Sequence, residues 1–353
     1  MKKTLLSLIL AAPAAFALEG LQFQHEDWEI ACDNTGTCRA AGYQNEDAPT
    51  NAEGYAEPVS LLLTREAGEN AAIKAQLQII PDERDSNYVD TKATLILNGK
   101  TLGTFTFPAD NPVQTLNAKQ TQALLAALPG KKAHVVVKAG TRQMTLSDKG
   151  AAAVLLKMDE FQKRLDTPSA LIKKGNSKHA VLAPVPAPQI KAVIPPQDAP
   201  RDITPDSSEH AVLLTLFRED FEGKSASCEL REEGQDFTLY PLGNGRLLTE
   251  SFCWLAAYNA AGHYAIVSDD LTTVIAKVRG SVEDDFNLND YNPASGELMG
   301  YFKGRGLGDC WHEERWRYDG ERFVQSFAAE HGMCRGFPGG AWEMPTLVKE
   351  IIN

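Results

Sequence analysis

The chain has 353 residues, of which 43% are hydrophobic, and a formal net charge of −12. This length exceeds what a single hydrophobic core usually organises, so two domains are expected. The acidic balance repels phosphate backbones and anionic lipid head groups, which excludes nucleic acid as an expected partner.

The N-terminus has the pattern of a cleavable signal peptide. Two lysines precede an apolar run over residues 5–12, and Ala15-Phe16-Ala17 gives the small-x-small pattern that signal peptidase recognises. We therefore expect residues 1–17 to be removed and the mature chain to begin at Leu18. No later stretch has the roughly 18 consecutive apolar residues of a membrane helix. The expected product has no membrane span and is soluble in the periplasm or secreted.

Residues 18–175 predict an antiparallel β-sandwich-like core. Residues 59–107 and 133–147 contain several short segments that are rich in β-branched residues or alternate between apolar and polar residues. Asn98-Gly99 lies between two such segments and is a strong signal for a hairpin turn.

Two helices are predicted within this first domain. The helix near 117–128 can begin at a capping box formed by Asn117 and Gln120. The helix near 148–165 has apolar residues at helical spacing, and Ser147 or Asp148 is its predicted cap. Its outer face is predicted to carry two i,i+4 ion pairs, Asp159 with Lys163 and Glu160 with Arg164.

A proline-rich stretch separates this region from the rest of the chain. Seven prolines lie between residues 183 and 205, so residues 176–210 are predicted to form a semi-rigid extended linker. Residues 211–353 predict a second, small disulfide-bonded β domain, with its first strand over residues 211–216. Asp319-Gly320 is the hairpin signal near its end. The expected class is mainly β (α+β), with two β-rich domains.

An even number of cysteines in an exported chain favours disulfides over free thiols. Sequence order predicts three local bridges, and the metal alternative lacks a C-x-x-C pattern or a cluster of His and Cys. The expected pairs are Cys32 with Cys38, Cys228 with Cys253, and Cys310 with Cys334.

Three segments carry a resemblance to a known family. They are residues 28–40, residues 158–164 followed by 170–175, and the Gly-rich run from Gly304 to Cys310. Together they resemble the bacterial domain of unknown function family 1176, and the first half is similar, more weakly, to the invasion-associated locus B family. The resemblance implies an exported six-cysteine protein and gives no mechanism. Trp311 stands where that family pattern usually has Gly.

Motifs for common catalytic sites are incomplete. His312-Glu313 begins like H-E-x-x-H, but Trp316 replaces the second His. Neither a G-x-S-x-G elbow nor a phosphate-binding P-loop is present. We therefore expect no cofactor and favour a protein that is not an enzyme.

One acidic stretch partly matches the ligand pattern of a calcium-binding loop. Asp285, Asn287 and Asn289 fit the first three ligand positions, which take oxygen donors. Position 6 should be Gly and is Asp290, and position 12 should be Glu and is Gly296. A solvated loop is the favoured interpretation, and a calcium site stays an open hypothesis.

The second domain is rich in aromatic residues, which could fill its core or line a groove for a carbohydrate or peptide. The aromatic residues considered are Trp254, Tyr258, Tyr264, Trp311, Trp316, Tyr318 and Trp342. The candidate binding residues selected for such a groove are Arg305, Asp309, Trp311 and Trp316.

The leading functional hypothesis is a non-catalytic binding module for an envelope protein or a cell-wall fragment. Inhibition of a basic hydrolase, helped by charge steering, is one form of it. The first alternative is an envelope hydrolase whose site is assembled only in the fold, and the second is a structural envelope component. The residues considered for the hydrolase are His263, His312, Asp309 and Glu313.

Overall fold

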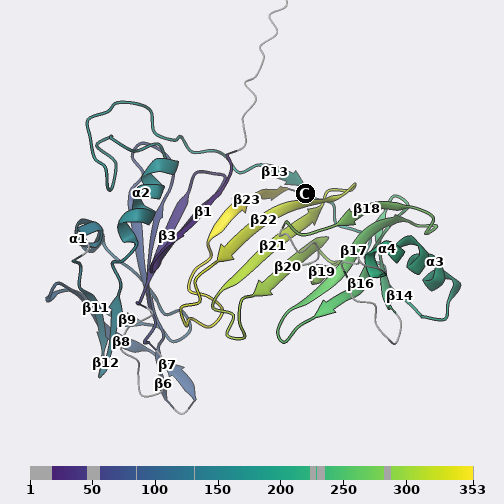
Figure 1. Cartoon of the computed structure of the whole chain (residues 1–353), viewed down its shortest axis with the longest axis horizontal. Helices are drawn as coiled ribbons and strands as arrows, with labels where there is room; N and C mark the ends of the chain where they lie inside the picture. Colours follow the sequence, from purple (N-terminus) through teal and green to yellow (C-terminus); the bar gives the residue numbers. More distant parts are fainter. Residues whose placement is uncertain are drawn as a thin grey trace, which may run out of the picture.

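The computed structural model describes residues 18–45, 56–84, 86–130, 132–222, 228, 235–281 and 288–352. The predicted signal peptide lies outside the described residues. Antiparallel sheets dominate the described part of the chain, with short helices at their faces, so the β-rich class is confirmed (Figure 1). None of the helices in these ranges is long and apolar enough to cross a membrane.

Two antiparallel sheets pack face to face in the first half of the chain. Alternate side chains of each strand point into the space between the sheets, as in β2, where Trp28, Ile30 and Cys32 belong to the core. The larger sheet has the order β1 (Leu21–His25), β2 (Trp28–Cys32), β3 (Cys38–Tyr43), β4 (Val59–Arg65), β5 (Ile73–Ile79), β10 (Val113–Thr115). The smaller has the order β12 (Arg142–Leu146), β11 (Val135–Ala139), β8 (Thr91–Leu97), β9 (Lys100–Phe107).

Asn98-Gly99 forms the predicted turn between β8 and β9, and both residues have positive φ. A two-stranded ribbon, β6 (Asp82–Arg84) with β7 (Asn87–Val89), extends from this half.

The first predicted helix is confirmed. Helix α1 (Ala118–Ala127) begins at Asn117, whose side chain accepts from the Gln120 amide, and the Gln120 side chain accepts from the Asn117 amide. A short 3-10 turn (Leu128–Gly130) follows. Local side-chain chemistry therefore suffices to place this helix.

The second helix, α2 (Ala151–Phe161), is shorter than the predicted 148–165, and the predicted cap is wrong. It begins after Gly150, which has a φ of 93° and no side-chain cap. A Cβ at Gly150 would lie 1.9 Å from the carbonyl oxygen of His25, so packing requires glycine there. Asp148 instead accepts from the Ala133 amide at 2.8 Å.

The two predicted surface ion pairs of this helix are also wrong, because Asp159 and Arg164 are buried. Asp159 accepts from the Leu171 amide at 2.7 Å. Arg164 donates to the Gly68 carbonyl at 2.5 Å. The chain leaves the helix at Phe161 and turns inward, so the helical spacing on which the pairs depended no longer applies.

The second half contains two five-stranded antiparallel sheets. The first has the order β14 (Arg201–Ile203), β15 (Phe237–Gly243), β16 (Arg246–Leu255), β17 (Ala260–Ser268), β18 (Val274–Val278). The second has the order β19 (Asp290–Asn292), β20 (Glu297–Lys303), β21 (Trp311–Tyr318), β22 (Phe323–His331), β23 (Pro345–Val348). Asp319-Gly320 lies in the turn between β21 and β22, as predicted.

Each face of the β14–β18 sheet has its own core. On β17, Ala265 and Val267 face helices α3 (Ser208–Leu216) and α4 (Arg218–Phe221), whereas Tyr264 and Ile266 face the β19–β23 sheet. The predicted strand over 211–216 is wrong, because these residues lie in α3. Ser207 caps this helix by accepting from the His210 amide, a start signal that outweighs the short apolar run.

The C-terminal segment returns to the first half of the chain. Met333, Phe337, Trp342 and Met344 pack on the outer face of the larger first sheet, around Tyr43. Figure 1 shows the β19–β23 sheet between the first half and the β14–β18 sheet. The larger first sheet is therefore covered on both faces.

The proline-rich stretch is also held by the C-terminus. Strand β13 (Gln189–Lys191) pairs in parallel with the last strand, β24 (Glu350–Ile352). The Val193 amide then donates to the Tyr318 carbonyl at 2.9 Å.

The disulfides join the pairs expected from sequence order, Cys32–Cys38, Cys228–Cys253 and Cys310–Cys334.

Candidate functional site

Arg305 and Asp309 form a close pair in the loop between β20 and β21. The Asp309 carboxylate is buried and accepts from Arg305 Nε at 2.6 Å and from the Gly336 amide at 2.6 Å. Burial raises the pKa of Asp309, but the hydrogen bonds from Arg305 and Gly336 outweigh it and leave that pKa below its usual value. Asp309 therefore links the Gly-rich loop to the segment after Cys334.

The two tryptophans of the predicted groove lie in different surroundings. Trp311 is buried beside Tyr301 and donates from Nε1 to the Gly339 carbonyl at 3.1 Å. Trp316 packs on the core between the two sheets of the second half and donates to Glu314 at 3.2 Å. The structure brings Arg305 and Asp309 together but does not place the two indoles beside each other.

The proposed calcium loop is only partly within the described residues. Asp285 and Asn287 lie outside them. The Asn289 side chain donates to the Tyr301 carbonyl at 2.8 Å. The calcium site stays a prediction.

Asp309 also lies with the Cys310 and Cys334 sulfurs within 4.8 Å. These sulfurs are bonded to each other, so they are not thiolate ligands for a metal.

The residues considered for a hydrolase occupy separate ion pairs. His263 is buried and contacts Asp220 at 3.2 Å, whereas His312 contacts Glu314 at 2.9 Å. Glu313 pairs with Arg315. With Asp309 held by Arg305, these four residues do not converge on one site.

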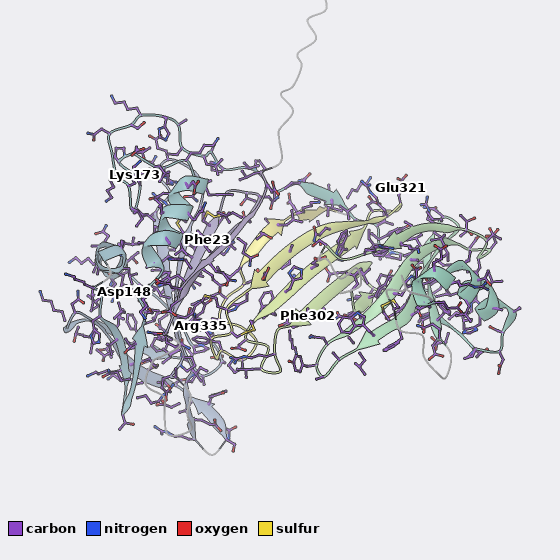
Figure 2. The ribbon with its side chains drawn as sticks, in the orientation of Figure 1. Phe23, Asp148, Lys173, Phe302, Glu321 and Arg335 are labelled. Carbon is purple, nitrogen blue, oxygen red and sulfur yellow. A yellow bond between two sulfur atoms is a disulfide. The ribbon has the colours of Figure 1, made fainter. Side chains whose placement is uncertain are left out.

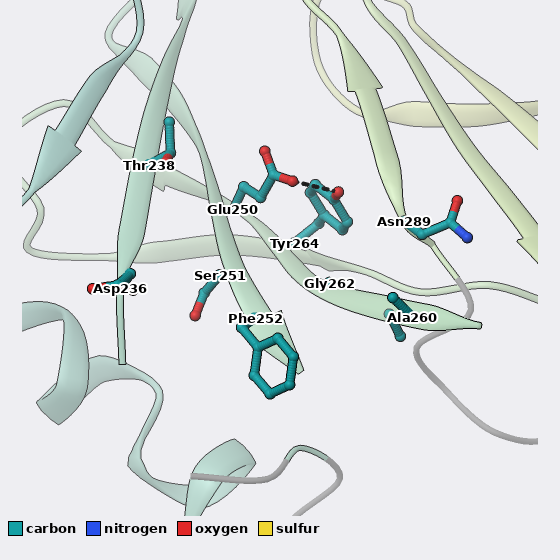
Figure 3. A pocket seen from close by; sticks show the side chains of 10 residues that line it. Asp236, Thr238, Glu250, Ser251, Phe252, Ala260, Gly262, Tyr264 and Asn289 are labelled. Carbon is teal, nitrogen blue, oxygen red and sulfur yellow. Dashed lines mark hydrogen bonds between the residues drawn. The ribbon is translucent and has the colours of Figure 1, made fainter. Parts of the chain in front are cut away.

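A cavity of about 290 Å³ lies on the β14–β18 sheet, near the end of β16 (Figure 3). It is formed mainly by β15, β16 and β17, with Asn289 from the segment before β19. This volume is close to the lower limit for small-molecule sites. The lining residues are Asp236, Thr238, Glu250, Ser251, Phe252, Ala260, Ala261, Gly262, Tyr264 and Asn289.

Glu250 is held in this cavity by two tyrosines. The hydroxyl of Tyr240 donates to Glu250 Oε2 at 2.7 Å, and the hydroxyl of Tyr264 donates to Oε1 at 2.8 Å. Thr238 and Tyr264 are the direct cross-strand neighbours of Glu250 on either side. Burial, with the charge of Glu250, raises the pKa of both tyrosines, so both remain hydrogen-bond donors at neutral pH.

Lining groups of this cavity favour a ligand that donates hydrogen bonds or is positively charged. Asp236 and Glu250 are acidic, and Thr238 and Asn289 add a hydroxyl and an amide group. Lysine, arginine and histidine do not occur among the ten lining residues. An ammonium group can satisfy a carboxylate and hydroxyl oxygens together, so it suits this set of acceptors.

Gly262 makes room for the Tyr264 ring, and replacing it should disturb the site. A Cβ at this position would lie 2.7 Å from Tyr264 Cε2. We expect Gly262→Ala to lower the free energy of unfolding by about 1–3 kcal/mol through overpacking. Urea unfolding measures this change. Gly130→Ala is the control, because no atom lies within 4 Å of its added Cβ; equal stability of the two variants would contradict the prediction.

Reasoning from the sequence did not select Glu250 as a site residue. It included Tyr264 among the aromatic residues but could not show which of them share a cavity. The sequence pattern did contain an indication of this position. Glu250 lies two residues after Leu248 on the same strand, so both side chains point to the same face, and Leu248 faces the core between the two sheets of the second half. An acid at an inward position requires a partner or a ligand.

Comparison with known proteins gives a family but no activity. The chain is 27% identical over 357 residues to the uncharacterised protein YpfG of Escherichia coli (strain K12), and the match covers 97% of this chain and 94% of that protein. No solved structure matches this chain. The weaker likeness to the invasion-associated locus B family is not supported by these comparisons. The model of the family described as protein of unknown function (DUF1176) matches residues 22–349, and the chain belongs to this family.

Proposed function

We propose that this protein is a non-catalytic binding protein of the periplasm, whose ligand is a cell-wall fragment that bears an amino group. The observation that carries the proposal is the Glu250 carboxylate, fixed at the cavity by Tyr240 and Tyr264. The three disulfides support an oxidising compartment outside the cytoplasm. Export by residues 1–17 and a periplasmic location are part of the proposal.

Preorganisation of Glu250 supports binding by this cavity. Each carboxylate oxygen accepts one tyrosine hydroxyl and retains capacity for another donor. Because the side chain is already held, a ligand ammonium group does not have to order it, and less conformational entropy is lost on binding. The hydroxyl of Thr238, on the same face of the sheet as Glu250, can orient the rest of a sugar or peptide fragment.

We further propose that residues 18–175 and 211–353 are two domains joined by the linker 176–210, whose last part packs with the second domain, because β14 (Arg201–Ile203) pairs with β15 and α3 begins at Ser208. The support is that each half has its own sheets and hydrophobic cores. The contacts of the C-terminal segment and of β13 with β24 hold the two units together.

Glu250→Gln is expected to weaken binding of an amine-bearing cell-wall fragment at least tenfold. The substitution keeps the size of the side chain but removes the charge that an ammonium group would contact. Titration calorimetry with muropeptides that carry a free amino group measures the affinity. The same muropeptides after chemical acetylation of that amine should bind the parent protein as weakly as the free form binds the variant.

Glu343→Gln is the matched control, because it removes an exposed acid away from the cavity and should leave affinity unchanged. Equal affinity of Glu250→Gln and parent would contradict the assignment of the site. Release of new reducing ends or free peptides during incubation with the parent protein would favour the hydrolase alternative instead.

A further inference from the structure

The turn between β16 and β17 is apolar and exposed. Leu255, Ala256, Ala257 and Tyr258 are consecutive exposed residues, with 71% of Leu255 and 47% of Tyr258 accessible. Hairpin turns usually carry Gly, Asn, Asp or Ser, whose backbones or side chains suit water and tight turns. Four exposed apolar residues in a row at a turn therefore need a reason other than turn formation.

A second exposed apolar segment lies beside this turn. Phe302 at the end of β20 and Leu307 in the following loop are 38% and 46% accessible. The Asn259 side chain joins the two segments, because it donates to the Lys303 carbonyl at 2.9 Å and accepts from the Lys303 amide at 2.8 Å.

The Tyr258 ring lies 3.7 Å from the position that a Cβ of Gly306 would occupy. The two segments therefore form one surface. We call it the apolar tip, formed by Leu255, Ala256, Ala257, Tyr258, Phe302 and Leu307. In Figure 1 the β16–β17 turn and the loop after β20 lie at the lower side of the two sheets of the second half, and Figure 2 labels Phe302 there.

The charges around the apolar tip differ in sign from the chain as a whole. The chain has 47 acidic and 35 basic residues, yet residues 251–268 and 298–308 contain no Asp or Glu. Lys303 and Arg305 lie in the second of these ranges, and the Arg305 side chain is about half exposed although it contacts Asp309. Because Arg305 is paired with Asp309, Lys303 leaves this apolar surface with a net positive charge, which is complementary to an apolar phase with anionic groups at its boundary.

We propose that the apolar tip is a membrane-docking surface that inserts into the head-group region of an anionic lipid bilayer. The four turn residues project beyond the end of the sheet, between Leu255 at the end of β16 and Ala260 at the start of β17, and are not part of a flat sheet face. A fluid lipid boundary can surround the apolar tip. Tyr258 has an apolar ring and a polar hydroxyl, which suits this boundary. The Lys303 ammonium group can contact lipid phosphates, whereas the Arg305 guanidinium is already paired with the buried Asp309 carboxylate.

The net acidic charge sets the orientation of this contact. The rest of the surface is repelled by anionic lipids, so the protein approaches with the apolar tip first. Ala260, directly after the turn, lines the cavity that contains Glu250. Docking would place the proposed ligand site close to the membrane surface.

Flotation of the purified chain with lipid vesicles tests the proposal. We expect the parent protein to float with vesicles of phosphatidylethanolamine and phosphatidylglycerol at 3:1 and to bind phosphatidylcholine vesicles at least fivefold more weakly. The double variant Leu255→Ser, Tyr258→Ser should lose at least tenfold in affinity for the anionic vesicles, because both side chains that insert most deeply are removed. Lys303→Gln should weaken anionic binding about fivefold.

Ile275→Ser is the matched control, because Ile275 is also exposed, at 43%, but lies on β18. It should bind vesicles as the parent does. Thermal unfolding of all variants should match the parent, since the changed side chains are exposed or, for Lys303, half-buried.

Two results would overturn the proposal: no flotation of the parent with either vesicle, or equal flotation of parent and double variant. A third would assign the apolar tip to protein recognition instead. In this outcome an envelope protein cross-links to the chain at Leu255, and the chain does not bind vesicles.

Discussion

Relative to the parent, the Glu29→Gln variant is expected to gain about 3 kcal/mol of unfolding free energy between pH 4.5 and pH 7. Glu29 is buried between the larger first sheet and the C-terminal segment, and burial raises its pKa to about 7. The folded protein therefore keeps this proton up to about pH 7, whereas the unfolded chain loses it near 4.5. As the pH rises through that window, the free energy of unfolding of the parent falls with each pH unit, and that of the variant does not.

His331 is expected to give the opposite sign. Burial lowers the pKa of His331 to about 4, so the folded protein keeps this ring neutral while the unfolded chain protonates it below about 6.5. The Ala341 amide donates to its Nε2 at 3.2 Å, which also favours a neutral ring. His331→Gln should therefore gain stability relative to the parent as pH falls from 6.5 to 4.

Geometry explains why the two groups are linked. The Tyr43 hydroxyl donates to Glu29 Oε1 at 2.6 Å and lies 3.1 Å from His331 Nε2. The Gly332 amide donates to Glu29 Oε2, and the charges of Glu330 and Arg335 also act on Glu29. In the parent, the unfolding free energy lost through Glu29 and that gained through His331 as the pH rises nearly cancel between pH 4.5 and 6.5.

Urea unfolding of parent and both variants at pH 4.5, 5.5, 6.5 and 7.5 measures these differences. Comparison with the parent removes the contributions of other titrating groups, such as Asp220 and Glu314, whose pKa values stay lowered in all three proteins. Slopes of the same sign in the two variants, or flat differences, would show that Glu29 and His331 do not carry the proton linkage described here.

The second large effect is expected for Trp342→Ala, which should lower the free energy of unfolding by about 3–5 kcal/mol. Trp342 lies in the core between the C-terminal segment and the outer face of the first sheet. Its Nε1 donates to Ser60 Oγ at 2.7 Å, and that hydroxyl donates to the Gly42 carbonyl at 3.0 Å. Truncation leaves a cavity and a buried hydroxyl with one partner fewer.

Two variants show whether the loss arises from packing. Trp342→Phe keeps a ring but removes the hydrogen bond, so it should cost about 1–2 kcal/mol. Tyr258→Ala truncates an exposed aromatic residue and should cost less than about 0.5 kcal/mol. If Trp342→Ala unfolds like the parent in urea, the C-terminal segment does not stabilise the first sheet.

Features that depend on neighbours in the sequence were predictable. The Asn117 and Gln120 capping box, the Asn98-Gly99 turn and the three disulfide pairs follow from residue chemistry and short spacing. The β-rich class follows from alternation, because a half-buried strand requires it. Local patterns can also conflict. The apolar run over residues 211–216 led to the prediction of a strand, although Ser207 caps a helix there.

The candidate site and the contact between the two halves needed the tertiary structure. Glu250 gains its role from Tyr240 and Tyr264 on the neighbouring strands, and strand pairing sets which side chains meet. Glu29 and His331 are about 300 residues apart in the chain, yet both contact Tyr43. Residue chemistry and spacing along the chain were enough to predict the disulfide pairs, the turns and the strand-rich class. Only long-range packing decided which polar groups became buried together, because burial depends on the whole fold and not on local propensity.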